Sequence, residues 1–176
     1  MLETTLYCLF VGVASSGLYG LYITRTIPKK ITKLREQVTW ERIPALRIAV
    51  QREAHTVVVG LLRESPAPTV ADFYKKRLLQ YFGLPRGLLY YVRPTSGFRN
   101  QIQNEMSDLR RYYSPAEIET DKQLRRLVDQ RDDLDYHDAL QRKLKLWLFV
   151  HIFLTYGLVF LAVFHTIMAH AFHGGM

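Results

Sequence analysis

The C-terminal stretch from Leu146 to Phe172 contains no Asp, Glu, Lys or Arg. A charge-free hydrophobic run of this length can cross a bilayer as one helix, and few other structures accommodate it. The sequence therefore predicts a transmembrane helix, which we assign to residues 144–176.

Two histidines lie inside this run, His151 and His165, fourteen residues apart. At 100° per residue, that spacing returns the second ring to within about 40° of the first, roughly 21 Å further along the axis. In a hydrocarbon core about 30 Å thick, one imidazole then lies in each leaflet. Ionisable side chains inside a membrane span are candidates for a functional site, because an unpaired polar group in lipid is costly.

The His151-x13-His165 spacing on an apolar helix resembles the haem-bearing helices of dihaem b-type cytochromes. In that family two helices each offer two histidines at this spacing, and the helix pair holds one haem near each membrane face. The resemblance implies that His151 and His165 ligate the iron of two b-type haems. It also implies an electron-transport subunit rather than an enzyme by itself, with a quinone among its candidate partners.

The chain differs from that family because it carries only one histidine helix. Bis-histidine ligation of two haems needs four imidazoles, so the other two must come from another chain. Either a homodimer or a different histidine-bearing membrane subunit meets this requirement. Two copies of a two-span chain would form a four-helix haem-binding bundle.

Other roles for the two histidines remain open from the sequence. They can be structural or proton-relay residues, since histidine also forms hydrogen bonds between helices, or they can ligate chlorophyll or another metal. If the histidines ligate no cofactor, the protein is a cofactor-free membrane anchor or assembly subunit that recruits partners through its basic middle section. Thr155 and Thr166 are expected near the two rings, whereas His170 belongs to a different face of the helix.

The N-terminal run from Leu6 to Thr24 is also uncharged. It follows Met1-Leu2-Glu3, which lacks the positive charge of a signal peptide, so residues 1–24 are predicted to be an uncleaved transmembrane helix. Small residues recur every four positions on one stripe of this helix. These residues, Gly12, Ser16 and Gly20, suit close helix packing or leave room for a porphyrin edge. Together with Gly157 of the second helix, they are the further residues expected to bind the cofactor.

The charges beside the two runs predict the topology. Basic residues follow the first run and precede the second, whereas the outer ends carry only Glu3 and neutral residues. The positive-inside rule then places residues 25–143 in the cytoplasm and both termini outside. We expect a two-pass integral protein of the bacterial inner membrane, in contact with anionic lipid headgroups.

The fold class predicted for the whole chain is an all-α membrane protein, with a basic and mainly helical domain at residues 25–143. Helices are expected from Thr69, as cap, to Gly83, and from Phe98 to Tyr112. Ser114-Pro115-Ala116-Glu117 has the spacing of a capping box and predicts the start of a third helix. Asp135 is expected to cap a separate helix leading into the second span, and Leu88 to Val92 to form a short strand or a buried turn.

No motif of a catalytic site occurs in the middle section, and the single cysteine, Cys8, excludes an intrachain disulfide or an all-cysteine metal site. His55 is expected to pack or form hydrogen bonds, and His137 to lie at a solvated helix start. The acids at 129, 132, 133 and 135 are interpreted as a charged helix junction rather than a cation site.

Lys75-Lys76-Arg77 lies among aromatic residues. Such a mixture also occurs on nucleic-acid-binding surfaces, but on a membrane protein we expect it to meet anionic headgroups, with an acidic redox partner as a further alternative. No nucleic-acid partner is predicted.

Overall fold

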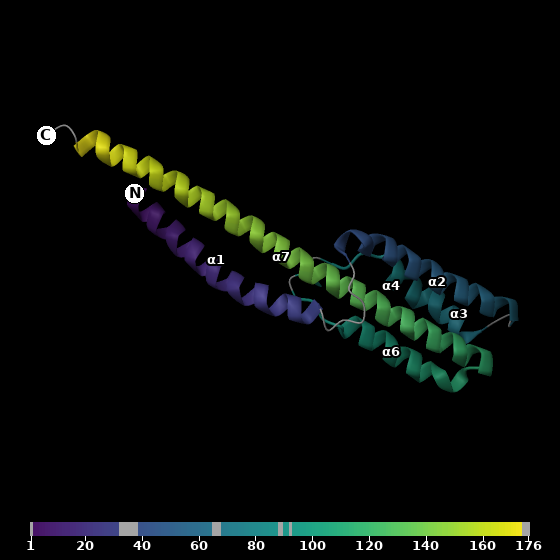
Figure 1. Cartoon of the computed structure of the whole chain (residues 1–176). Helices are drawn as coiled ribbons and strands as arrows, with labels where there is room; N and C mark the ends of the chain where they lie inside the picture. The colour runs from purple at the N-terminus through teal and green to yellow at the C-terminus, as the bar shows by residue number, and fades with distance from the viewer. Residues whose placement is uncertain (1, 32–38, 65–67, 88–89, 92, 174–176) are drawn as a thin grey trace. The chain divides into compact units, whose positions relative to one another are not determined.

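The computed structural model describes residues 2–31, 39–64, 68–87, 90–91 and 93–173 (Figure 1). All regular elements among these residues are helical, as the sequence predicts. The chain divides into two compact units, one formed by Met1–Lys33 with Arg142–Met176 and the other by Leu34–Gln141. Helix α7, Pro115–His173, contributes to both.

The first unit is an antiparallel pair of helices, α1 (Leu2–Ile31) and the part of α7 from Arg142 onward. Figure 1 shows the start of α1 and the end of α7 at the same end of this pair. Both helices are long and apolar enough to cross a membrane. Helix α1 continues seven residues beyond the predicted boundary at residue 24, and its last turn carries Lys29 and Lys30, where cations suit the helix dipole.

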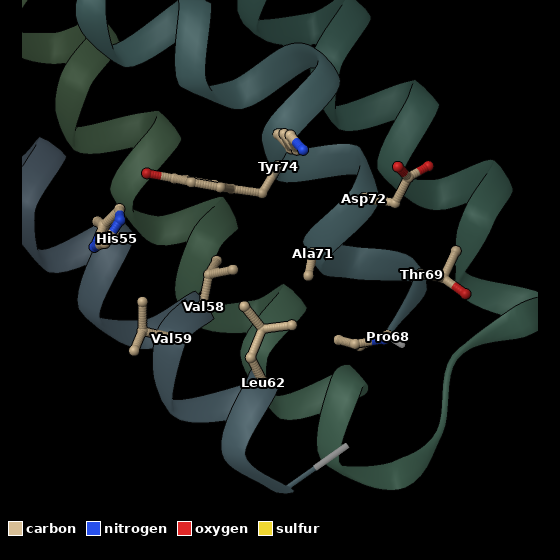
Figure 2. A pocket seen from close by; sticks show the side chains of 10 residues that line it. His55, Val58, Val59, Leu62, Pro68, Thr69, Ala71, Asp72 and Tyr74 are labelled. Atoms are coloured by element: carbon tan, nitrogen blue, oxygen red, sulfur yellow. The ribbon is translucent and has the colours of Figure 1, made fainter. Parts of the chain in front are cut away.

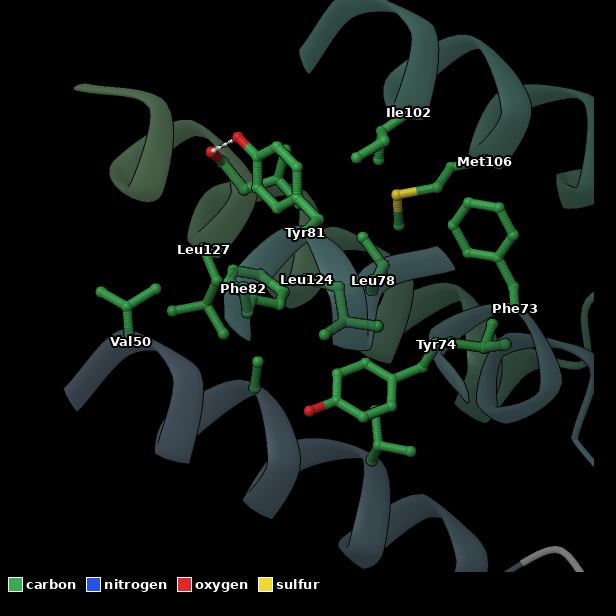
Figure 3. Close-up of a cluster of buried hydrophobic side chains, with 14 of the residues drawn as sticks. Val50, Phe73, Tyr74, Leu78, Tyr81, Phe82, Ile102, Met106, Leu124 and Leu127 are labelled. Carbon is green, nitrogen blue, oxygen red and sulfur yellow. Dashed lines mark hydrogen bonds between the residues drawn. The ribbon is translucent and has the colours of Figure 1, made fainter. Parts of the chain in front are cut away.

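The second unit is a small helical domain around an apolar core (Figure 3). Its elements are η1 (Trp40–Arg42), α2 (Ile43–Glu64), α3 (Thr69–Phe73), the π-helical segment η2 (Tyr74–Leu78), α4 (Leu79–Gly83), α6 (Gly97–Leu109), η3 (Arg110–Tyr112) and the first part of α7. Residues such as Val58, Leu78 and Leu124 meet in the core, because each helix repeats apolar residues at helical spacing. The buried hydroxyl of Tyr81 donates to the carbonyl of Val128 at 3.2 Å.

The predicted helix from Thr69 to Gly83 is present as the continuous series α3, η2 and α4. The prediction that Thr69 caps it is wrong, since Thr69 is already helical and Pro68 precedes the helix. The capping acceptor comes from a distant residue. Glu117 Oε1 of α7 accepts a hydrogen bond from the backbone N–H of Val70 at 3.2 Å.

The capping box at the start of α7 is confirmed. Glu117 Oε2 accepts from the backbone N–H of Ser114 at 2.8 Å, and Ser114 Oγ accepts from the N–H of Glu117 at 3.4 Å. One carboxylate thus serves two helix starts. Burial opposes its ionisation, but the hydrogen bonds from Ser114 and Val70 outweigh this and lower the pKa of Glu117.

The predicted helix start at Asp135 is wrong, because α7 runs without a break from Pro115 to His173. Asp135 is fully buried and accepts a hydrogen bond from Arg86 Nε at 2.7 Å. Its carboxylate also forms ion pairs with Arg47 at 2.6 Å and Arg131 at 3.3 Å. The Asp135 carboxylate therefore neutralises buried arginines inside the domain. For this reason Asp135 neither starts a helix nor belongs to a solvated helix junction.

Neighbouring acids of α7 extend this ion-pair network. Asp138 accepts from the indole N–H of Trp40 and from Arg47, both at 3.0 Å, and Asp132 lies 3.5 Å from Arg86. Burial raises the pKa of Asp132, against the opposing effect of nearby arginines. His137 is buried between these acids, so the prediction of a solvated histidine is wrong as well.

Two further expectations concern the surface and the loop of this domain. Tyr74, Tyr81 and Phe82 are core residues, so they are not interleaved with exposed Lys75 and its basic neighbours as on a nucleic-acid-binding surface. Within Leu88–Val92 only residues 90 and 91 are described, and both are helical rather than extended; the other three lie outside the described residues.

Candidate functional site

The His151 side chain is half-buried on the face of α7 that meets α1. Its Nδ1 lies 3.2 Å from Ser16 Oγ, within hydrogen-bonding distance. Ser16 comes from the small-residue stripe of α1, so the structure brings together two of the predicted site residues, 135 positions apart in the chain. The Nδ1 atom is occupied by this contact, which leaves Nε2 as the nitrogen available to another ligand.

Trp147 lies one turn before His151 and completes the cluster. Its indole ring stacks on the imidazole with a centroid separation of 5.4 Å and an interplanar angle of 17°. Its Nε1–H donates to the backbone carbonyl of Ser16 at 3.0 Å. The imidazole plane is therefore held on one side by the indole and at its Nδ1 edge by the Ser16 hydroxyl.

Gly20 makes room for this arrangement. A Cβ at this position would lie 1.9 Å from Cζ2 of Trp147, so only glycine fits beneath the indole. Gly17 faces the imidazole more loosely, with its Cβ position 3.9 Å from His151 Cε1. At Gly20 the structure thus has close helix packing, the first of the two roles considered for the stripe.

The other predicted glycines lie in more open places. A Cβ on Gly12 or on Gly157 would meet no described atom within 4 Å outside its own helix. The expectation that they adjoin a porphyrin stays a prediction. Their difference from Gly20 shows that residues on one stripe, four positions apart, need not share one role.

His165 is half-buried and forms no hydrogen bond within the described part of the chain. The pairs Ser16–His151 and Gly20–Trp147 define an antiparallel register between α1 and α7 near His151. The two histidines thus share a helix but differ in their hydrogen bonding.

The threonines expected near the rings bond to their own helix. Thr155 Oγ1 donates to the carbonyl of His151 at 2.8 Å, and Thr166 Oγ1 to that of Ala162 at 2.9 Å. His170 is exposed, with Nδ1 3.1 Å from the carbonyl of Thr166. These contacts use the threonine hydroxyl protons, so neither threonine is placed to donate to an imidazole.

No family model, curated protein or solved structure matches this chain. The functional interpretation therefore depends on the residues and their geometry.

The donor set can be tested for its fit to haem iron. A histidine that ligates a metal usually donates its other ring N–H to a nearby acceptor, which fixes the tautomer and leaves one nitrogen free to bind. His151 meets this condition when its proton is on Nδ1 and Ser16 Oγ accepts it. Among the described residues no group of three or more His, Cys, Asp or Glu is arranged around a metal ion. The described residues of one chain therefore offer His151 and His165 as two separate nitrogen donors, and only His151 has a partner for its second ring nitrogen.

Trp147 is the site residue that sequence reasoning missed. A tryptophan beside Lys145 is typical of an anchor at the membrane interface, so its position alone does not indicate a contact with His151. The signal was nevertheless present: Trp147 and His151 are four residues apart on one helix face, opposite a stripe that is small enough to receive an indole.

A cleft lies within the helical domain, between α2 and the α3–η2 segment (Figure 2). This cleft has a volume of about 560 Å³, and its walls are mainly apolar, with Val58, Leu62 and Pro68 among them. His55 lines the cleft with its ring edge-on to Tyr74, 6.5 Å between centroids, but it is exposed, so the expectation that it packs inside the domain stays a prediction.

Proposed function

We propose that the protein is a membrane electron-transfer subunit that binds two b-type haems, one per leaflet, through His151 and His165. The observation that carries the proposal is the arrangement of His151 in an apolar helix pair: Nδ1 lies 3.2 Å from Ser16 Oγ and the ring stacks on Trp147, which leaves Nε2 as the nitrogen for a ligand. Two same-face histidines at leaflet spacing on a charge-free helix support it.

The positions of the charges along both helices support a membrane setting. In the register of the pair, Arg25 is the first charge after the α1 run, and Lys145 is the last before the α7 run. They lie about three residues apart along the axis, or roughly 4.5 Å. Both helices therefore become charge-free at nearly the same level. His151 lies roughly 9 Å beyond Lys145 and His165 roughly 30 Å beyond it.

The distribution of basic residues refines the proposed topology. Seven of the 24 basic residues, and no acids, lie in residues 25–33 and 142–145. The compact unit Leu34–Gln141 holds 17 basic and 15 acidic residues, a net charge of only +2. The basic excess thus adjoins the two spans, where it favours a cytoplasmic placement of residues 25–143 and contact with anionic headgroups. The same distribution argues against partner recruitment by a generally basic domain.

The chain's own residues would perform three tasks. His151 and His165 would hold the haem iron through their imidazole nitrogens, the apolar faces of both helices would exclude water, and Ser16 and Trp147 would keep the His151 imidazole in one orientation. When bound, haem iron supplies a one-electron carrier whose potential depends on its axial ligands and their hydrogen bonds. Because one chain offers one imidazole per leaflet, we propose a dimer about an axis along the membrane normal, which makes a four-helix bundle. Another histidine-bearing subunit is the alternative.

Visible absorption of the purified protein, made with haem supplied, tests this proposal. A b-type spectrum is expected, lost in the double variant His151→Ala/His165→Ala and retained in His170→Ala, whose ring is exposed on another part of α7. Acid-acetone should extract the haem, since the chain has no Cys-x-x-Cys-His attachment site. A spectrum that survives in the double variant would refute the proposal, and a colourless protein would refute haem binding by the homodimer.

A further inference from the structure

We infer that Ser16 is a positioning residue for His151 and makes the two haem sites unequal. The inner site is the one held by His151, on the cytoplasmic side in the proposed topology, and it has the lower reduction potential. The inference rests on the proposed function, since it concerns the ligands of those haems. It goes further by naming a residue of α1 that acts through His151 without touching the iron.

The first step concerns the nitrogen that binds. Nδ1 of His151 lies against Ser16 Oγ at 3.2 Å, so iron can be approached only by Nε2. Ligation by Nε2 requires its lone pair, which keeps the ring proton on Nδ1. Ser16 Oγ is then the acceptor of that proton, because it is the polar atom that Nδ1 meets.

The second step concerns the rigidity of this contact. Trp147 donates its indole N–H to the carbonyl of the same Ser16 and stacks on the His151 ring. The indole itself fits closely over Gly20, where a Cβ would lie 1.9 Å from its ring. Ser16 is therefore fixed through its backbone while its hydroxyl holds the imidazole, which is the arrangement that a supporting hydrogen bond to a metal ligand needs.

The third step compares His151 with His165. The His165 ring has no hydrogen bond within the described residues, whereas Nδ1 of His151 lies 3.2 Å from Ser16 Oγ. A hydrogen bond from Nδ1–H makes an imidazole a more basic ligand and favours the oxidised, more positive iron. The inner site, with this bond, should therefore be harder to reduce than the outer site.

A potentiometric titration of the full-length protein, followed by its visible spectrum, tests the inference. The wild type should titrate in two components, and His151→Ala should remove the lower one. Ser16→Ala should raise the lower component and weaken haem binding at that site by about 10- to 100-fold, the usual effect of losing such a partner. Ser16→Thr retains a hydroxyl and should restore the wild-type value. Ser15→Ala, at the exposed neighbouring serine, is the matched control and should change nothing.

Each outcome has a distinct meaning. If the protein is red but neither reduction potential changes in Ser16→Ala, this inference is overturned and haem binding stands. The same holds if the component that Ser16→Ala shifts is still present in His151→Ala. A colourless wild type would overturn the proposed function and this inference together.

Discussion

Trp147 lies in the space that a side chain on Gly20 would fill, and from there it reaches both α1 and His151. Its indole ring is so close that a Cβ on Gly20 would fall 1.9 Å from Cζ2. The same ring donates to Ser16 and stacks on the imidazole. One glycine on α1 thus determines how a histidine on α7 is presented.

This relationship predicts the effect of a single methyl group. Gly20→Ala should force the rigid indole out of place and destabilise the protein by about 1–3 kcal/mol, as overpacking does. Thermal unfolding in detergent, followed by near-ultraviolet circular dichroism, reports both the stability and the Trp147 environment. Gly12→Ala is the control on the same stripe, because a Cβ there meets no described atom within 4 Å beyond the helix itself. Equal behaviour of the two variants would contradict the packing described here.

The buried network in the helical domain predicts a larger effect. Asp135→Asn removes the negative charge that faces Arg47, Arg86 and Arg131, and should cost about 3–5 kcal/mol of unfolding free energy because buried cations lose their counter-ion. Asp72→Asn is the exposed control. Its pair with Lys76 is largely in solvent and should contribute about 0–1 kcal/mol. Denaturant titration of both variants measures the difference. Similar small losses would mean that Asp135 does not hold the domain together.

Glu117 predicts a dependence of stability on pH. Its pKa is lowered in the folded protein from an ordinary value of 4.5, so its contribution is fully present above that value and is lost as the pH falls through the folded pKa. Glu117→Gln should cost about 1–3 kcal/mol at neutral pH, since an amide has one acceptor oxygen for two helix starts. Thermal unfolding from pH 7 to pH 3 should show a flatter acid limb in the variant. A variant with the acid limb of the wild type would contradict this role.

The charges beside the spans predict the orientation of the chain. A fusion of alkaline phosphatase after Met176 should be active, because that end is expected outside, whereas a fusion at Gly97 should be inactive. Replacing Arg142, Lys143 and Lys145 by Gln should weaken this preference, because it removes the basic residues beside the second span. The opposite activities in the two fusions would exchange the inner and outer histidines.

The sequence predicted local features well, since they depend on neighbouring residues. The capping box of Ser114 and Glu117, the helix ending at Gly83 and the two long apolar helices follow from nearest-neighbour chemistry and periodicity. The features that were mispredicted depend on partners far along the chain. Asp135 looked like a helix cap because its arginine partners at positions 47 and 86 are distant in sequence.

The candidate site shows the same division. The face shared by His151 and His165 follows from helical geometry within one segment. The role of Trp147 required the register between α1 and α7, which the sequence alone does not determine. Once Ser16 is known to face His151, the indole over Gly20 follows one turn away.

Native mass spectrometry of the protein, expressed with haem supplied and released gently from detergent, tests the central claim most directly. It measures the number of haems and the number of chains in one particle. If each chain supplies one imidazole in each leaflet, the particle should have the mass of two chains plus two haems. The haems should be lost in His151→Ala/His165→Ala. A particle that carries no haem in any oligomeric state would contradict the account.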